Sequence, residues 1–185
     1  PYAIIRLVAL NAYHDVAKRG IDIEMLRSII EHLKPFGNVF ISSEKPLPEE
    51  FETYKLPVDS SNIHHALAFA DLFIGDSQSM TVEAALLGTP ALRINDFAAK
   101  ISVLNMLERD YGLTSSFKTG QLGEMLQKTD ELIQKQDICE EYQKNKSRFM
   151  EQAVDVSAFF AWFIGNYPAS VRILKENTRY SDNFL

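Results

Sequence analysis

Short apolar runs alternate with helix-like patterns along the first half of the chain. Residues 2–8 are an apolar run rich in β-formers. Apolar side chains then recur every three or four positions, as on one face of a helix, at Ile23, Leu26, Ile29, Ile30 and Leu33. A proline and a glycine follow at positions 35 and 37 and predict the end of this helix.

The same alternation continues to residue 95. It predicts, in chain order, a strand over residues 38–42, a helix from Ser60 or Ser61 to Ala70, a strand over 71–75, a helix from Ser79 to Leu87 and a strand over 90–95. Residues 44–60 are predicted to be mostly irregular, with room for a brief strand at 54–58. After Leu104 the pattern is helical to the end of the chain.

Strands that alternate with helices of about ten residues indicate βαβ units and a mostly parallel sheet. The apolar runs do not alternate with polar residues, which is typical of strands covered on both faces. The sequence therefore predicts an α/β fold, a Rossmann-like three-layer α/β/α sandwich with a helical C-terminal section. We expect one domain over residues 1–185, with the βα core in 1–96 and a mainly helical part in 97–185.

Composition and charge narrow the classes of partner. The chain has 185 residues, of which 46% are hydrophobic and 24% charged, as in a soluble globular domain with a sizeable core. The net charge of −6 argues against nonspecific binding to nucleic acid or to an anionic membrane. The apolar stretches are far shorter than the ~20 residues of a membrane span. No signal peptide heads the chain, so we expect a cytoplasmic protein.

In open parallel sheets, ligands bind beyond the carboxyl ends of the strands. Four loops are predicted there, over residues 11–20, 42–45, 76–79 and 95–100. The third lies in the stretch I-G-D-S-Q-S-M-T-V-E-A-A-L-L-G-T-P, residues 74–90, where an apolar strand meets a polar loop and a helix of small residues. Ser77 in this loop has two interpretations. It is either the nucleophile of a hydrolase elbow or part of a cradle whose amides and hydroxyls hold a phosphate.

Chain order favours the phosphate cradle. In the hydrolase elbow the histidine follows the serine, whereas all histidines of this chain precede Ser77: His14, His32, His64 and His65. A histidine from an earlier loop could still approach Ser77, because catalytic triads occur in other chain orders. A serine hydrolase therefore stays a minor alternative.

Glu83 also favours a ligand. On the predicted helix it lies between Leu86 and Leu87, within an apolar face. A charge there is unfavourable unless it has a partner or lies at the wet rim of a cleft. Simpler roles stay open as well. The helix dipole stabilises an acid in the first turn, and Ser77 can be the N-cap.

The segment D-S-Q-S-M-T-V-E-A-A-L-L-G-T-P resembles the D-S-G-G-x-x-E-E-A-x-x-x-G-x-P segment of non-hydrolysing UDP-N-acetylglucosamine 2-epimerases. These enzymes share the GT-B architecture with many nucleotide-sugar glycosyltransferases. The preceding L-P-V-D-S-S-N-I-H-H-A-L-A-F-A-D-L-F-I-G is similar to their Pro-containing loop, helix and strand. The start, I-I-R-L-V-A-L-N-A-Y-H-D, looks like the first strand and loop of a GT-B C-terminal domain. The whole chain resembles still more closely the C-terminal half of an uncharacterised bacterial and archaeal family grouped with GT-B proteins.

This resemblance implies a nucleotide-sugar site, with a UDP-sugar as substrate and no separate cofactor. The residues that it implies for binding are Ser77, Gln78 and Ser79 for the diphosphate, Glu83 for the ribose, His14 near the phosphates, and Pro57, Val58 and Ile63 beside the base. It also implies that the chemistry belongs to a glycosyltransferase or a sugar-nucleotide epimerase-like enzyme. The catalytic residues stay unassigned, and we expect them in an N-terminal domain, because this chain opens at Pro1 without an initiator methionine.

The motif departs from the family pattern at three positions. Gln78 and Ser79 stand where the family has two glycines, and Val82 replaces the first of its paired glutamates. These departures keep a second hypothesis open, a degenerate GT-B half that serves as a non-catalytic interaction module. No metal, Walker A or dinucleotide motif is present, so no metal is predicted. The apolar residues 158–164 are expected to pack on this domain or to face the absent one.

Overall fold

The computed structural model describes residues 1–9, 19–96 and 101–185. These residues form two compact units, Pro1–Lys146 and Ser147–Leu185. His14 lies outside the described residues, so its predicted place near the phosphates stays a prediction.

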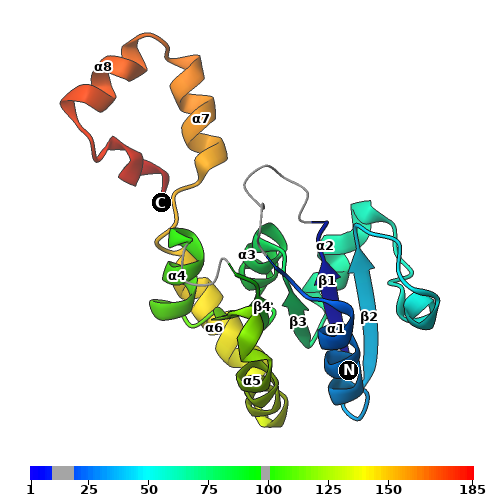
Figure 1. The fold of residues 1–185 in the computed structure, drawn as a ribbon. Helices are drawn as coiled ribbons and strands as arrows, with labels where there is room; N and C mark the ends of the chain where they lie inside the picture. Colours follow the sequence, from blue (N-terminus) through cyan, green and yellow to red (C-terminus); the bar gives the residue numbers. More distant parts are fainter. Residues whose placement is uncertain (10–18, 97–100) are drawn as a thin grey trace. The chain divides into compact units, whose positions relative to one another are not determined.

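Five parallel strands form the sheet of the first unit (Figure 1). They are β1 (Tyr2–Leu7), β2 (Asn38–Ser43), β3 (Leu72–Gly75), β4 (Ala91–Ile94) and β5 (Thr114–Phe117). Their order in the sheet is β2-β1-β3-β4-β5. The chain therefore adds β2 on one side of β1 and the later strands on the other. The direction of winding reverses between β1 and β3, and this switch point is where open α/β sheets bind ligands.

Two layers of helices cover the sheet, which confirms the predicted Rossmann-like α/β fold (Figure 1). One layer holds α1 (Ile23–Leu33) and α5 (Leu122–Gln134), and the other holds α2 (Ile63–Ala68), α3 (Gln78–Leu87) and α4 (Ser102–Arg109). The helix α6 (Ile138–Met150) begins in this unit and ends in the next. Short 3₁₀ turns cover Glu49–Tyr54 (η2), Ser60–Asn62 (η3) and Thr119–Gln121 (η4).

The core beneath α3 explains the small residues of its sequence. Ala84 and Ala85 are fully buried, and Ala84 packs with Phe73 of β3 and Ala91 of β4. Side chains of this size let the helix backbone lie close to the sheet. The helix ends at Gly88, whose φ of 82° lies in the left-handed region that favours glycine at this position.

Two features differ from the sequence prediction. The strand β5 was not expected, because its sequence T-S-S-F is polar. It pairs with β4 alone at the edge of the sheet, and three of its four residues are only half-buried. Residues 54–58 were expected to contain a brief strand, but only a single bridge forms there, between Ile41 and Lys55.

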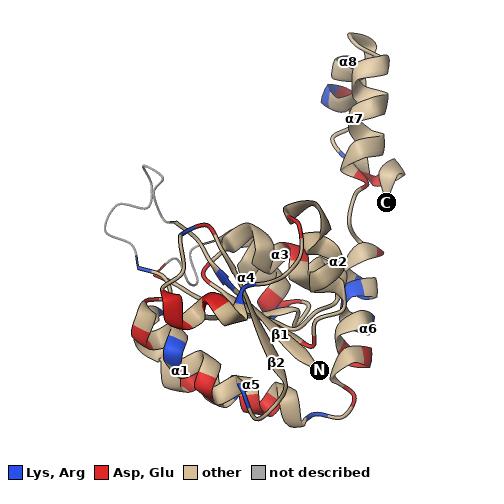
Figure 2. Cartoon of the chain, turned by 90° about the vertical axis from the view of Figure 1, so that its right-hand side faces the viewer, with Lys and Arg blue, Asp and Glu red and all other residues tan. Residues whose placement is uncertain are grey.

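The second unit contains α7 (Val156–Gly165), α8 (Ala169–Glu176) and η5 (Tyr180–Phe184). The helix α7 carries no charged residue (Figure 2). Part of it packs within the unit, with Trp162 stacked on Tyr180 at 4.5 Å between ring centroids. Phe160 and Ile164 of the same helix remain 54% and 72% exposed. The expectation that these side chains pack on this domain or face an absent one stays a prediction.

Candidate functional site

Two cavities open at the switch point. Cavity A, of about 710 Å³, is lined at the ends of β1 and β2 and at the start of α1 by residues that include Ala9, Ile21, Ser43, Lys45 and Asp76. Cavity B, of about 310 Å³, lies beside the first turn of α3 and is lined by Arg6, Ser42, Lys55, Val58, Ile63 and Met80, among others. Ser43 lines both cavities, so they adjoin at the end of β2.

Asp76, directly after β3, accepts hydrogen bonds from both ends of the segment that joins β1 to α1. Its Oδ1 accepts the N–H of Val8 at 2.8 Å, and its Oδ2 accepts the N–H of Ile21 at 3.1 Å. The side chain is buried, with 3% of the residue exposed. Burial raises the pKa of Asp76 to about 6, although these backbone donors and the charge of Lys45 oppose the rise. The carboxylate therefore fixes both ends of the segment 8–21 at the rim of cavity A.

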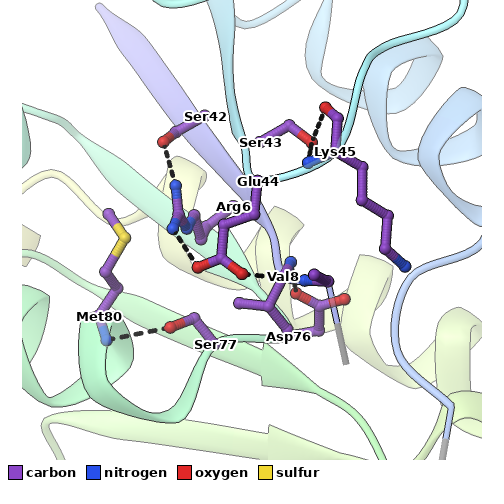
Figure 3. Close-up of polar contacts among 10 residues, drawn as sticks. Arg6, Val8, Ser42, Ser43, Glu44, Lys45, Asp76, Ser77 and Met80 are labelled. Atoms are coloured by element: carbon purple, nitrogen blue, oxygen red, sulfur yellow. Dashed lines mark hydrogen bonds and ion pairs between the residues drawn. The ribbon is translucent and has the colours of Figure 1, made fainter. Parts of the chain in front are cut away.

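Ser77 caps the helix that follows. Its backbone is extended, and its Oγ accepts the N–H of Met80 at 3.2 Å (Figure 3). The same residue is 8% exposed. Capping satisfies one of the N–H groups that a helix leaves without a partner in its first turn. The N–H groups of Gln78 and Ser79 lie in that turn too, which makes it a place where an anion can bind.

The other residues of the motif are more exposed. Gln78 is half-buried and Ser79 is exposed. Neither they nor Ser77 are among the described lining residues of cavities A and B. The first turn of α3 reaches cavity B instead through Met80.

Glu83 has a partner within the chain. Its Oε2 lies 3.3 Å from Nε2 of His64 on α2, and the two side chains are 38% and 59% exposed. The acid thus has a partner and access to water, but it lines neither cavity A nor cavity B. This contact also assigns His64 a role, as the partner of Glu83, that the sequence did not indicate.

The three residues expected beside a nucleobase divide between two hollows. Val58 and Ile63 line cavity B. Pro57, together with Val58, lines a separate apolar hollow of about 480 Å³ that also contains Tyr2 and Phe40. Val58 lies at the boundary of both hollows, so only part of the expected set faces the switch point.

Arg6 is a candidate binding residue that sequence reasoning missed. It lines cavity B from β1. Its Nη1 donates to Oγ of Ser42 at 2.7 Å, and its Nη2 lies 2.5 Å from Oε1 of Glu44 (Figure 3). The other carboxylate oxygen of Glu44 accepts the N–H of Ala9 at 3.0 Å. The sequence feature that could have identified it is an arginine within the apolar run 2–8, because charged residues are rarely buried without a partner.

A second arginine occupies the same row of the sheet. In register, Arg6 lies opposite Gly75, and Gly75 lies opposite Arg93 of β4. Arg93 is fully buried, and its Nη2 donates to Oγ of Ser116 at 3.2 Å. Its Nε and Nη1 have no hydrogen-bond partner among the described residues. Burial lowers the pKa of Arg93, with the charge of Glu108 acting in the opposite direction.

The described part of the chain shows neither a metal-binding cluster nor a membrane-spanning helix. No group of three or more His, Cys, Asp or Glu side chains there could hold a metal ion. No described helix is both long enough and apolar enough to cross a membrane.

The comparisons with known proteins concern the fold. No protein-family model and no curated protein sequence matches the chain. A crystal structure of the glycotransferase of kitacinnamycin superposes with a TM-score of 0.51 at 10% identity, over 77% of this chain and 38% of that one. The fold is GT-B-like. The chain spans little more than a third of that protein's length.

A second solved structure is the wall teichoic acid polymerase TagF soaked with CDPG. It covers 80% of this chain and 35% of its own, at 11% identity and a TM-score of 0.43. A likeness this weak carries no argument about the site. At the identities found, the comparisons show an architecture and leave the ligand to be inferred from the chain's own residues.

Proposed function

We propose that the chain is the nucleotide-sugar-binding half of a glycosyltransferase or of a sugar-nucleotide epimerase-like enzyme, with a UDP-sugar as its ligand. The observation that carries this proposal is the composition of cavity B. Apolar side chains of Val58 and Ile63 lie there together with the guanidinium of Arg6, at the switch point of a GT-B-like fold. An apolar wall suits a base, and a guanidinium suits a phosphate.

The first turn of α3 adds a second set of donors for the phosphates. Ser77 holds the helix start in place, and the N–H groups of Gln78 and Ser79 are the ones that a bound anion can use. Glu83, in the second turn of α3 and paired with His64, offers a carboxylate to ribose hydroxyls, although it lines neither cavity. In this proposal His64 orients Glu83 and a ribose shares the carboxylate.

The chemistry itself is assigned to residues outside this chain. In proteins with two such halves, the reacting groups meet in the cleft between them. We therefore expect the chain alone to bind the nucleotide without turnover, and we expect the full-length protein to carry the acceptor site. The identities of sugar and acceptor are left to experiment.

Calorimetry on the full-length protein tests the proposal, with UDP, other nucleoside diphosphates and CMP as ligands. We expect UDP to bind, and we expect Ser77→Ala and Glu83→Gln to weaken binding. Val58→Ala should also weaken it, whereas Val103→Ala is the matched control. Both valines are about equally exposed, at 43% and 41%, but only Val58 lines cavity B. Absence of binding at millimolar UDP would overturn the proposal and would favour the non-catalytic interaction module.

The serine hydrolase alternative has its own test. The Oγ of Ser77 accepts the Met80 N–H, and no histidine among the described residues is hydrogen-bonded to it. Covalent labelling of Ser77 by a fluorophosphonate would revive that alternative, because labelling needs an activated serine hydroxyl.

A further inference from the structure

The carboxylate of Glu44 contacts one lining residue of each cavity. Its Oε1 pairs with Arg6, which lines cavity B, and its Oε2 accepts the N–H of Ala9, which lines cavity A. Ser43, the residue before Glu44, lines both. One carboxylate thus bridges a guanidinium on one side and a backbone amide on the other (Figure 3).

The donors and the acceptor of this bridge differ in how firmly they are held. Arg6 belongs to β1 and is paired on both sides by neighbouring strands, and its side chain is 18% exposed. Its Nε is buried and has no partner among the described residues, so the guanidinium has donor capacity left. Glu44 lies just beyond β2, and its side chain is 44% exposed. The arginine is held by the sheet, and the exposed carboxylate beside it can be replaced.

We propose that Glu44 occupies a phosphoryl subsite formed by Arg6 and the Ala9 N–H, and that a phosphate of the ligand displaces it. A carboxylate and a phosphoryl group both place two oxygens against a guanidinium fork, so the same donors recognise either. The position fits the nucleotide sugar of the proposed function, on which this inference rests. With a base against Val58 and Ile63 in cavity B and a sugar in cavity A, the diphosphate falls where the carboxylate now lies.

Each cavity also supplies a lysine at its border. Lys55 lines cavity B and Lys45 lines cavity A. Once the carboxylate of Glu44 leaves, Arg6 loses its counter-ion at the subsite, while Lys55 and Lys45 remain in the lining of the adjoining cavities. Glu44 is therefore an internal competitor that sets how tightly a phosphoryl anion binds.

Titration of the full-length protein with inorganic pyrophosphate, followed by calorimetry or by ³¹P NMR, tests this inference. Glu44→Gln should bind pyrophosphate about fivefold more tightly than the wild type, the scale expected for loss of a half-exposed competing ion pair. Arg6→Gln should bind about tenfold more weakly or worse, because a charge-assisted hydrogen bond is lost. The double variant should behave like Arg6→Gln.

The control is a second arginine–glutamate pair, neither residue of which lines cavity A or B. Glu50 pairs with Arg27 at 2.8 Å, and its side chain is 49% exposed, close to the value for Glu44. Glu50→Gln makes the same change in net charge and should leave pyrophosphate binding unchanged. Thermal unfolding of every variant checks that each is folded. Folded Glu44→Gln that binds pyrophosphate no better than the wild type would overturn the inference.

Parallel titrations with UDP separate this inference from the proposed function. If UDP binds equally to the wild type, Glu44→Gln and Arg6→Gln, the inference fails while the nucleotide site stands. If pyrophosphate binding depends on Arg6 and Glu44 as expected but UDP binds no better than pyrophosphate, the anion subsite stands and the nucleotide proposal fails.

Discussion

The carboxylate of Asp76 fills the space in which a side chain at position 20 would begin. A Cβ placed on Gly20 would lie 2.9 Å from both Cβ and Cγ of Asp76, and closer still to Oδ2. Gly20 precedes Ile21, whose N–H donates to that same oxygen. The glycine therefore lets the loop after β1 approach the end of β3 closely enough to be held there.

Gly20→Ala should destabilise the protein by about 1–3 kcal/mol, the range typical of overpacking a buried contact. The new methyl group must displace Asp76 or the backbone at Ile21, and either movement weakens the bond between them. Urea unfolding measures the change. Gly120→Ala is the control, because a Cβ there meets nothing within 4 Å. Equal effects of the two substitutions would contradict this account.

The protonation of Asp76 should make the stability of the protein depend on pH. Its pKa is about 6 when folded and has a reference value of 3.8. Between these values the folded state binds more protons than the unfolded state, so the free energy of unfolding falls as pH rises. The contribution is full below about pH 4 and is lost as pH rises through about 6, with a slope of up to about 1.4 kcal/mol per pH unit.

Asp76→Asn removes the titrating group and should remove that slope. Between pH 4 and pH 6.5 the urea midpoint should stay constant for the variant and fall with rising pH for the wild type. An unchanged slope would show that another group titrates in this range.

Capping by Ser77 predicts a modest and specific loss. Ser77→Ala should destabilise the protein by about 1 kcal/mol, because the N–H of Met80 loses its acceptor. Ser77→Gly should cost only a few tenths of a kcal/mol, because glycine tolerates the cap position. Chemical denaturation of both variants measures the difference. If alanine were no worse than glycine, the Oγ–Met80 bond would have no energetic role.

Arg93 is expected to cost the fold stability. Its guanidinium is fully buried, and two of its nitrogens have no described partner. Replacing such a group with an apolar side chain of similar length is often neutral or stabilising by about 1–4 kcal/mol. Arg93→Met should therefore leave the free energy of unfolding unchanged or raise it. A strong loss of stability, measured by urea unfolding, would mean that the guanidinium is satisfied in solution.

Local spacing of apolar residues is enough to predict the α/β pattern. Periodic apolar residues place α1 and α3 within a residue of their predicted ends, and continuous apolar runs mark β1, β3 and β4 as buried strands. These elements were predictable because the spacing of their apolar residues along the chain shows which face of each is buried. The polar strand β5 was not, because its pairing with β4 comes from a distant segment.

The polar residues that meet at the site are brought together by tertiary packing. Arg6 and Glu44 are 38 positions apart, and Asp76 reaches Val8 across 68 positions, so no local pattern could pair them. Parallel pairing brings the carboxyl ends of β1, β2 and β3 to one edge of the sheet, and the reversal between β1 and β3 opens the cavities there. The motif around Ser77 marked this edge from the sequence. The charged groups that line it were set by strand order, which depends on packing of the whole sheet.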